Sequence, residues 1–281
     1  MKQRLNIVKL SILLMMCMLN LSLFGQMQRL YYIDDFTTLD SARYEITYEV
    51  EKISDTSKSN DKLIDIHKHL IGNEITKAYS YLLYQNDSIC TILENQIVNF
   101  PSPPPGAGTD ELLKNRLTGK IQVKKRVDGT VFCYEENKPS LNWTIHNNRK
   151  VIANYSCQNA TAEFRGRKYE AWFTIEIPIS DGPYKFGGLP GLILEIQDSE
   201  RHYTFKCIGI KKLTSVLPIK SQNFLYTQTT REKLQNFLIK KYNNITQYYN
   251  SMGVTYAVKI DGKIIFNPKD HSLPYNPIEL E

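Results

Sequence analysis

Two acidic side chains frame the most glycine-rich stretch of the chain, "DGPYKFGGLPGLILEIQD" at residues 181–198. Asp181 opens this stretch and Glu195 lies near its end, and a pair of carboxyl groups is what hydrolysis by a general acid and a general base requires. Asp before Gly-Pro is also ordinary turn chemistry, and nothing in the spacing brings the two carboxyl groups together. A carboxylate-based hydrolase is therefore an alternative hypothesis.

The glycines themselves do not form a phosphate-binding motif. Neither the G-x-x-x-x-G-K-[ST] spacing nor a G-x-G-x-x-G that opens a helix is present, and the apolar alternation of "LILEIQ" (192–197) predicts a strand after the glycines. There is no G-x-S-x-G serine motif in the chain. We interpret Leu189–Leu192 as a type II turn, with Pro190 at its second position and a positive φ at Gly191.

His67 and His69 are spaced so that a strand would point both imidazoles to one side, as a metal site requires. No cysteine or carboxylate accompanies them at metal-ligand spacing, and "DIHKHL" is otherwise polar. The pattern favours a solvated strand edge, and no metal ligand is predicted.

Basic and aromatic side chains gather at the turn "RGRK", residues 165–168. Arginine beside aromatic rings binds carboxylates, phosphates or sugars, although a solvated hairpin tip is the simpler interpretation. The predicted binding surface combines this turn with the glycine-rich motif, and no catalytic residue or cofactor is predicted. Its residues are Arg165, Arg167, Tyr169, Trp172, Pro183, Gly187, Gly188, Leu189, Pro190 and Gly191.

The N-terminus has the pattern of a secretory signal peptide. Residues 1–9 carry three basic side chains and no acid, residues 10–24 form an apolar run, and Gly25 supplies a small residue for cleavage. Cleavage would lower the formal net charge from +6 to +3, a weak and scattered charge that does not indicate nucleic-acid binding. We therefore expect an exported protein, located in the periplasm or associated with the outer membrane.

Four cysteines lie beyond residue 25, at Cys90, Cys133, Cys157 and Cys207. In an exported protein they could form two disulfides in three possible pairings, or they could be buried thiols. None forms a C-x-x-C pair, so neither a zinc ribbon nor a thioredoxin-type site is indicated.

The rest of the chain is predicted to be mainly β (α+β), as one domain over residues 26–281 with a proline-rich loop at 101–109. A short helix is expected at 111–117. A capping box at Thr229 and Glu232 and an apolar stripe through Ile245 predict one long C-terminal helix, which would cover a strongly curved antiparallel sheet or half-barrel. The predicted strands are 43–53, 77–84, 88–98, 120–127, 130–135, 151–164 with a bulge near Gln158, 171–179, 192–197, 202–210 and a final hairpin around Asp261-Gly262.

The segment from about Trp143 to Ile210, with the intact motif G-L-P-G-L-I at Gly188–Ile193, resembles the GLPGLI family of exported Bacteroidetes proteins. Tyr184 stands where many members carry tryptophan. The resemblance implies an exported envelope protein, and it brings no established activity and no catalytic residues.

Together these features predict a non-enzymatic ligand-binding, carrier or assembly module of the cell envelope. The candidate partners are an apolar ligand or an outer-membrane protein. The alternatives are the carboxylate-based hydrolase and a structural partner that adds a strand to a neighbour.

Overall fold

The computed structural model describes residues 33–93, 102–260 and 262–281. The predicted signal peptide, residues 1–25, lies outside the described residues. Within the described residues, no helix is both long enough and apolar enough to span a bilayer.

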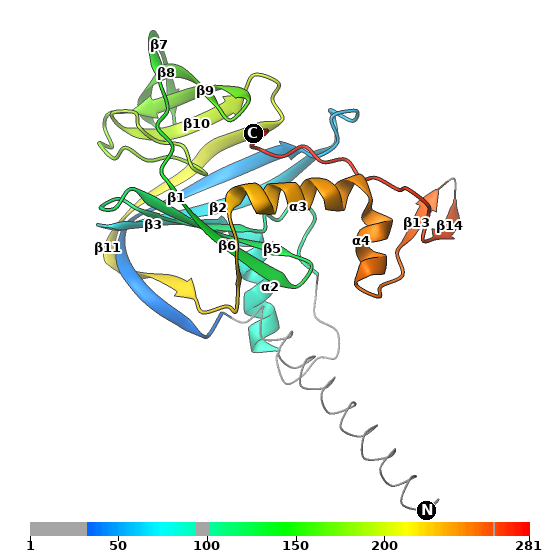
Figure 1. Ribbon diagram of the computed structural model, residues 1–281. Coiled ribbons are helices and arrows are strands. Elements are labelled where there is room, and N and C mark those ends of the chain that lie inside the picture. The colour runs from blue at the N-terminus through cyan, green and yellow to red at the C-terminus, as the bar shows by residue number, and fades with distance from the viewer. Residues whose placement is uncertain (1–32, 94–101, 261) are drawn as a thin grey trace, which may run out of the picture.

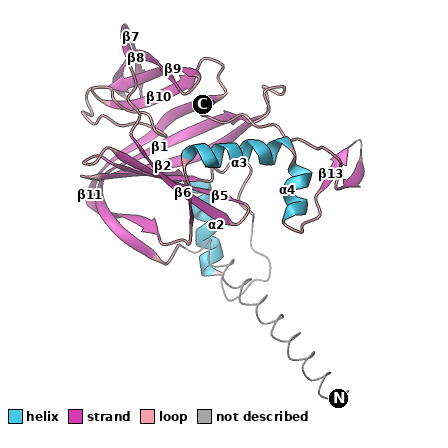
Figure 2. Cartoon of the chain, in the orientation of Figure 1, coloured by secondary structure: helices cyan, strands magenta, loops and turns pink. Residues whose placement is uncertain are grey.

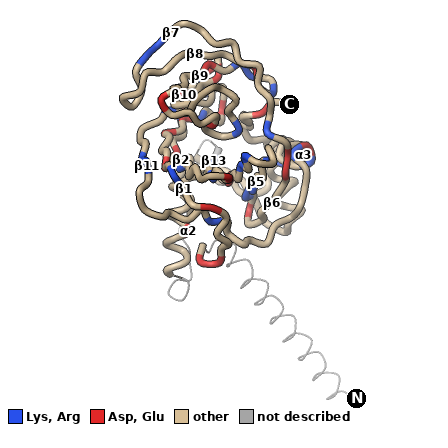
Figure 3. The backbone as a smooth tube through the Cα atoms, turned by 90° about the vertical axis from the view of Figure 1, so that its left-hand side faces the viewer, with Lys and Arg blue, Asp and Glu red and all other residues tan. Residues whose placement is uncertain are grey.

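Twelve strands form one large sheet, which confirms the mainly β prediction (Figure 1). The sheet is open, with the order β12-β6-β5-β4-β3-β2-β1-β11-β10-β9-β8-β7, and all neighbours are antiparallel except β12 beside β6. In the side view of Figure 3, β11 and β6 lie on opposite sides of the molecule with β1, β2 and β5 between them. The strands are β1 Phe36–Ile53, β2 Lys62–Ile71, β3 Ile75–Ser80, β4 Asp110–Asn115, β5 Lys120–Val127, β6 Thr130–Asn137, β7 Thr144–Ile152, β8 Tyr155–Phe164, β9 Arg167–Thr174, β10 Leu192–Asp198, β11 Tyr203–Gln222 and β12 Thr227–Gln228, with β13 Ala257–Ile260 and β14 Lys263–Phe266 as a separate hairpin.

The helices are short, and the prediction of one long C-terminal helix is wrong (Figure 2). Instead, α3 (Arg231–Asn243) and α4 (Ile245–Ser251) are divided at Asn244. The Asn244 side chain accepts a hydrogen bond from the Gln247 N–H and so starts a new helix, as asparagine commonly does at an N-cap. The buried residues Leu234 and Leu238 of α3 pack against β3–β6.

Two segments change type between prediction and structure. The chain leaves β3 at Ser80 and enters helix α2 (Tyr81–Ile92). The strand expected at 77–84 is therefore correct up to Ser80 and wrong beyond it, and the strand expected at 88–98 is wrong where it is described. Ser80 caps this helix by accepting a hydrogen bond from the Leu83 N–H at 3.1 Å. The helix expected at 111–117 is wrong too, because residues 110–115 form β4 in the middle of the sheet.

Tight turns explain where the predicted strand boundaries are right and where they are wrong. Asp128 and Gly129 have positive φ and join β5 to β6 as expected. Ala153 and Asn154 also have positive φ, and they divide the predicted strand 151–164 into β7 and β8. The irregular register opposite Gln158 lies in β7, between Ile145 and Arg149, and not in β8 as predicted.

The loop at residues 181–191, here called the motif loop, does not contain the predicted type II turn. Positive φ occurs at Tyr184 and Gly188, and not at Gly191. Gly191 is required for another reason: a Cβ there would lie 2.0 Å from the backbone oxygen of Thr174, the last residue of β9. Since β9 ends at Thr174, the strand predicted at 171–179 is wrong beyond that residue, and Ile175 is exposed.

Gly191→Ala should lower the free energy of unfolding by roughly 1–3 kcal/mol, because the new methyl group overlaps backbone that cannot move aside cheaply. Gly209→Ala in β11 is the matched control, since its Cβ would meet Thr47 at an ordinary 3.6 Å. Denaturant unfolding of the two variants measures the difference. Equal stability of the two would contradict the steric explanation.

Candidate functional site

A cavity of about 530 Å³ lies between the inner face of the sheet and a roof formed by α3 and residues 274–279. Figure 1 shows this C-terminal segment in red, running past α3 towards β10. The floor comes from β1–β6 and β11. Many lining side chains are apolar or aromatic: Val50, Ala78, Leu112, Val123, Tyr134, Tyr184, Tyr203, Phe205, Leu234, Leu238, Tyr242 and Tyr275.

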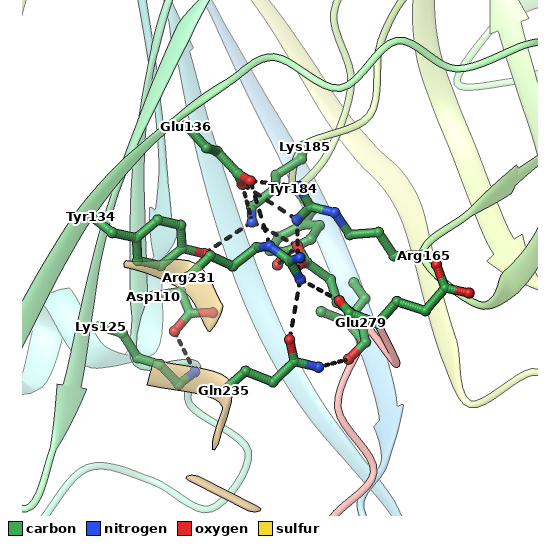
Figure 4. Close-up of polar contacts among 12 residues, drawn as sticks. Asp110, Lys125, Tyr134, Glu136, Arg165, Tyr184, Lys185, Arg231, Gln235 and Glu279 are labelled. Carbon is green, nitrogen blue, oxygen red and sulfur yellow. Dashed lines mark hydrogen bonds and ion pairs between the residues drawn. The ribbon is translucent and has the colours of Figure 1, made fainter. Parts of the chain in front are cut away.

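Charged side chains meet beside this cavity in what we call the Lys185 cluster: Glu136, Arg165, Lys185, Arg231 and Glu279 (Figure 4). Lys185 has no exposed surface, and its ammonium group contacts Glu136 and lies 2.6 Å from a carboxylate oxygen of Glu279. It also donates a hydrogen bond of 3.0 Å to the Tyr134 hydroxyl. The two carboxylates and three cations come from β6, the β8–β9 turn, the motif loop, α3 and the C-terminal segment.

The cluster holds Glu279 in its ionised form. Burial raises the pKa of Glu279, but Lys185, the Tyr184 hydroxyl and Arg165 outweigh it, so that this pKa lies below its usual value. Tyr184 donates to Glu279 at 2.6 Å. Burial and the Glu279 charge raise the pKa of Tyr184 well above its usual value, so Tyr184 is a neutral donor.

A second buried ion pair holds the start of the motif loop. Asp181 is 3% exposed and lies 2.5 Å from the ammonium nitrogen of Lys114 in β4. It also accepts hydrogen bonds from the Thr76 hydroxyl at 2.7 Å and the Gly182 N–H at 2.8 Å. Burial raises the pKa of Asp181, but Lys114 and these hydrogen bonds outweigh it and the pKa lies below its usual value.

The arginines of the "RGRK" turn are ion-paired, so the interpretation as a solvated hairpin tip is wrong for them. Arg165 belongs to the Lys185 cluster, and Arg167 is 2.7 Å from Asp198. Arg167 also donates hydrogen bonds to the Asn276 side chain and the Pro277 carbonyl. Tyr169 donates to the Ile278 carbonyl at 3.2 Å, so this turn holds the C-terminal segment that roofs the cavity.

The other predicted binding residues lie in the framework around the motif loop. Trp172 lies under the Lys150 ammonium at 4.3 Å, Leu189 is buried in the core, and the Gly187 carbonyl accepts a hydrogen bond from Trp143. None of the ten predicted binding residues lines the 530 Å³ cavity. Their role in binding stays a prediction.

The two acids that suggested hydrolysis are held in separate ion pairs. Asp181 pairs with Lys114 in β4, whereas Glu195 lies 2.6 Å from Lys150 in β7. Neither contact brings the two carboxylates together.

His67 and His69 lie in β2, an inner strand, so the predicted solvated edge is wrong. His67 shares a 2.9 Å hydrogen bond with Asp65, and both residues line the cavity. His69 is buried, and burial together with the Lys114 charge lowers its pKa well below the usual value, so that the ring is neutral. Within the described residues, no three His, Cys, Asp or Glu side chains are grouped as a metal site would need.

The four cysteines beyond residue 25 are buried free thiols. Burial raises the pKa values of Cys157 and Cys207 to about 11, which keeps both as unreactive thiols at neutral pH.

Lys52 is a site residue that the sequence did not indicate. It lines the cavity, and its ammonium group has no hydrogen-bond or ion-pair partner among the described residues. Burial lowers the pKa of Lys52, and the nearby Lys125 charge lowers it further. The Asp110 and Asp65 charges raise this pKa, but they do not outweigh the lowering. Lys52 follows the buried Val50 by two residues in β1, and alternate residues of a strand share a face. This alternation is the sequence signal that could have assigned Lys52 to the inner face.

Comparison with known proteins bears on part of this region. Residues 162–195 match a family model described as "Protein of unknown function (Porph_ging)", which covers the end of β8, all of β9, the whole motif loop and the first half of β10. No curated protein matches the chain.

Two solved structures of PNGF-II, in the P21 and C2 space groups, are similar to this chain at 14% and 13% sequence identity, each with a TM-score of 0.47. Each match covers 78% of this chain and 35% of the PNGF-II chain. This chain therefore spans about a third of the length of those proteins.

Lys185→Met should lower the free energy of unfolding at neutral pH by about 3 kcal/mol, because it leaves buried carboxylates without their central cation. Glu279 has a lowered pKa in the folded protein, so its stabilising contribution is present above the unfolded value of about 4.3 and is lost as the pH falls through the folded value. The deficit of the variant should therefore shrink below about pH 4.

Denaturant unfolding at neutral and acidic pH measures this effect, with Lys168→Met as the control. Lys168 is 76% exposed, and among the described residues it pairs only with the equally exposed Glu163. A deficit that matches the control, or one that is independent of pH, would contradict the assigned role of the cluster.

Proposed function

We propose that this chain is an exported cell-envelope protein of the GLPGLI family and acts as a non-enzymatic ligand-binding or carrier module. The ligand occupies the 530 Å³ cavity beneath α3 and the C-terminal segment. The N-terminal signal pattern and the motif at Gly188–Ile193 support export and family membership, and the cavity supports the binding role.

The cavity is the observation that carries this proposal. Its volume is within the range of about 300–1,000 Å³ that is common for small-molecule sites. Strands form the floor and α3 with the C-terminal segment forms the roof, so a ligand would be covered on two sides. The mixture of aliphatic and aromatic lining suits a ligand with an apolar body.

The charged side chains around the cavity suggest that the ligand also has a polar end. Lys125 pairs with Asp110 at 2.6 Å, Lys241 pairs with Asp128, and Arg231 pairs with Glu279 at 3.4 Å. Lys52 lacks such a carboxylate partner among the described residues. A ligand with an apolar body and one anionic head group would bury its body under α3 and place the head beside Lys52.

Leu238→Trp should reduce binding of cis-parinaric acid, a fluorescent fatty acid, at least tenfold, because the larger ring fills the cavity from the roof. Ile239→Trp is the matched control, since Ile239 is the next residue of α3 and is partly exposed outside the cavity lining. A fluorescence titration measures both variants, and circular dichroism confirms that each is folded. Equal binding by the two variants, or no binding by the unaltered protein, would count against the proposal.

The anionic head is tested separately with Lys52→Met. Removal of this charge should weaken the fatty acid about tenfold while leaving the uncharged methyl ester unaffected. Lys62→Met is the control, because Lys62 lies on β2 and pairs with Glu51 at the exposed surface. Equal losses for acid and ester would contradict a charge-specific role of Lys52.

Strand addition has one supporting observation. Strand β7 is the outer strand of the sheet, and most of its residues are exposed, including Val151 at 73%. Its free edge could receive a strand from a partner. A partner captured through β7 by mild crosslinking in the host would favour this assembly role over the carrier role.

A further inference from the structure

A second cavity, of about 550 Å³, opens on the other side of the motif loop. We call it the basic chamber, because five of the described side chains that line it are cationic and only one, Asp181, is acidic. The cations are Arg43, Lys114, Arg116, Lys120 and Lys138.

The strands place the two cavities on the same face of the sheet. In β4, Asp110 and Leu112 line the first cavity and Lys114 lines the basic chamber. In β5, Val123 lines the first cavity and Ile121 lines the basic chamber. Alternate residues of a strand point to one face, so the chambers lie end to end along the strands, with the motif loop contributing Tyr184 to one and Asp181 to the other.

The positive charge of the basic chamber is not neutralised by its own carboxylate. Asp181 is occupied by Lys114, the Thr76 hydroxyl and the Gly182 N–H. Burial is the largest cause that lowers the pKa of Lys114, and the Lys138 and Arg116 charges lower it further while Asp181 raises it. The field that the outer cations produce therefore extends to the base of the chamber.

Three of the outer cations contact only neutral oxygens. Arg43 donates to the Asn73 side chain at 3.2 Å, and Arg116 donates to the backbone oxygens of Gly72 and Asn73. Lys138 donates to the Ser180 carbonyl at 3.2 Å. Among the described residues no carboxylate lies within ion-pair distance of these three, whereas Lys120 reaches Glu135 at 3.7 Å on the exposed surface.

We propose that the basic chamber binds a diphosphate group, held by Arg43, Arg116 and Lys138. Guanidinium groups recognise phosphate oxygens with paired hydrogen bonds, and lysine adds a mobile positive charge. The three cations come from β1, the β4–β5 turn and the segment after β6, and all three line the chamber. A diphosphate carries several negative charges in one compact group, which suits three lining cations that have no carboxylate within ion-pair distance among the described residues.

Inorganic pyrophosphate is the probe, titrated calorimetrically into the unaltered protein and into Arg43→Gln, Arg116→Gln and Lys138→Gln. Each substitution should weaken binding about tenfold, and added salt should weaken binding by the unaltered protein. Lys168→Gln is the control, because it removes the same charge from an exposed site outside both cavities.

Arg116→Lys keeps the charge but loses the planar guanidinium group. Its affinity for pyrophosphate should lie between those of the unaltered protein and Arg116→Gln. Thermal unfolding checks that each variant is folded. Absence of binding by the unaltered protein, or a loss in Lys168→Gln as large as in the chamber variants, would overturn the proposal.

Discussion

The structure depends on two buried charges carried by one loop. Asp181 and Lys185 are four residues apart, and each is neutralised by partners from a different part of the fold. A buried ion without a partner costs several kcal/mol, so displacement of the loop from its observed position is unfavourable. That position brings Phe186 and Leu189 into the core and separates the two cavities.

The same constraint reaches the C-terminal segment. Glu279 is a partner of Lys185, and Arg165 and Arg167 hold the residues around it through Glu279, Asn276 and Pro277. Since residues 274–279 form part of the cavity roof, the ion pairs that fix the motif loop also determine the shape of the proposed ligand site. This gives the glycine-rich motif a structural role: it connects the sheet to the roof, and it does not present a phosphate loop.

Local signals in the sequence predicted much of the sheet but little of the site. The Asp128-Gly129 turn and the alternation of residues 192–197 fixed their strands, because hairpin geometry and side-chain period act over a few residues. Residues 81–92 contain apolar residue types like those of the strands, yet they form a helix. Ser80 caps this helix, and a pattern of alternating residues does not reveal such a cap. The partners of Lys185 lie 49 and 94 residues away in sequence, at Glu136 and Glu279, so only the folded sheet brings them together.

The proposed function requires that the chain carries a small molecule in the cavity between the sheet and the C-terminal roof. Native mass spectrometry of the protein, purified gently from the envelope of its own host, tests this most directly. A carrier should give a species heavier than the polypeptide by the mass of one small molecule, which is released when the protein unfolds. A single species with the mass of the polypeptide alone would contradict it.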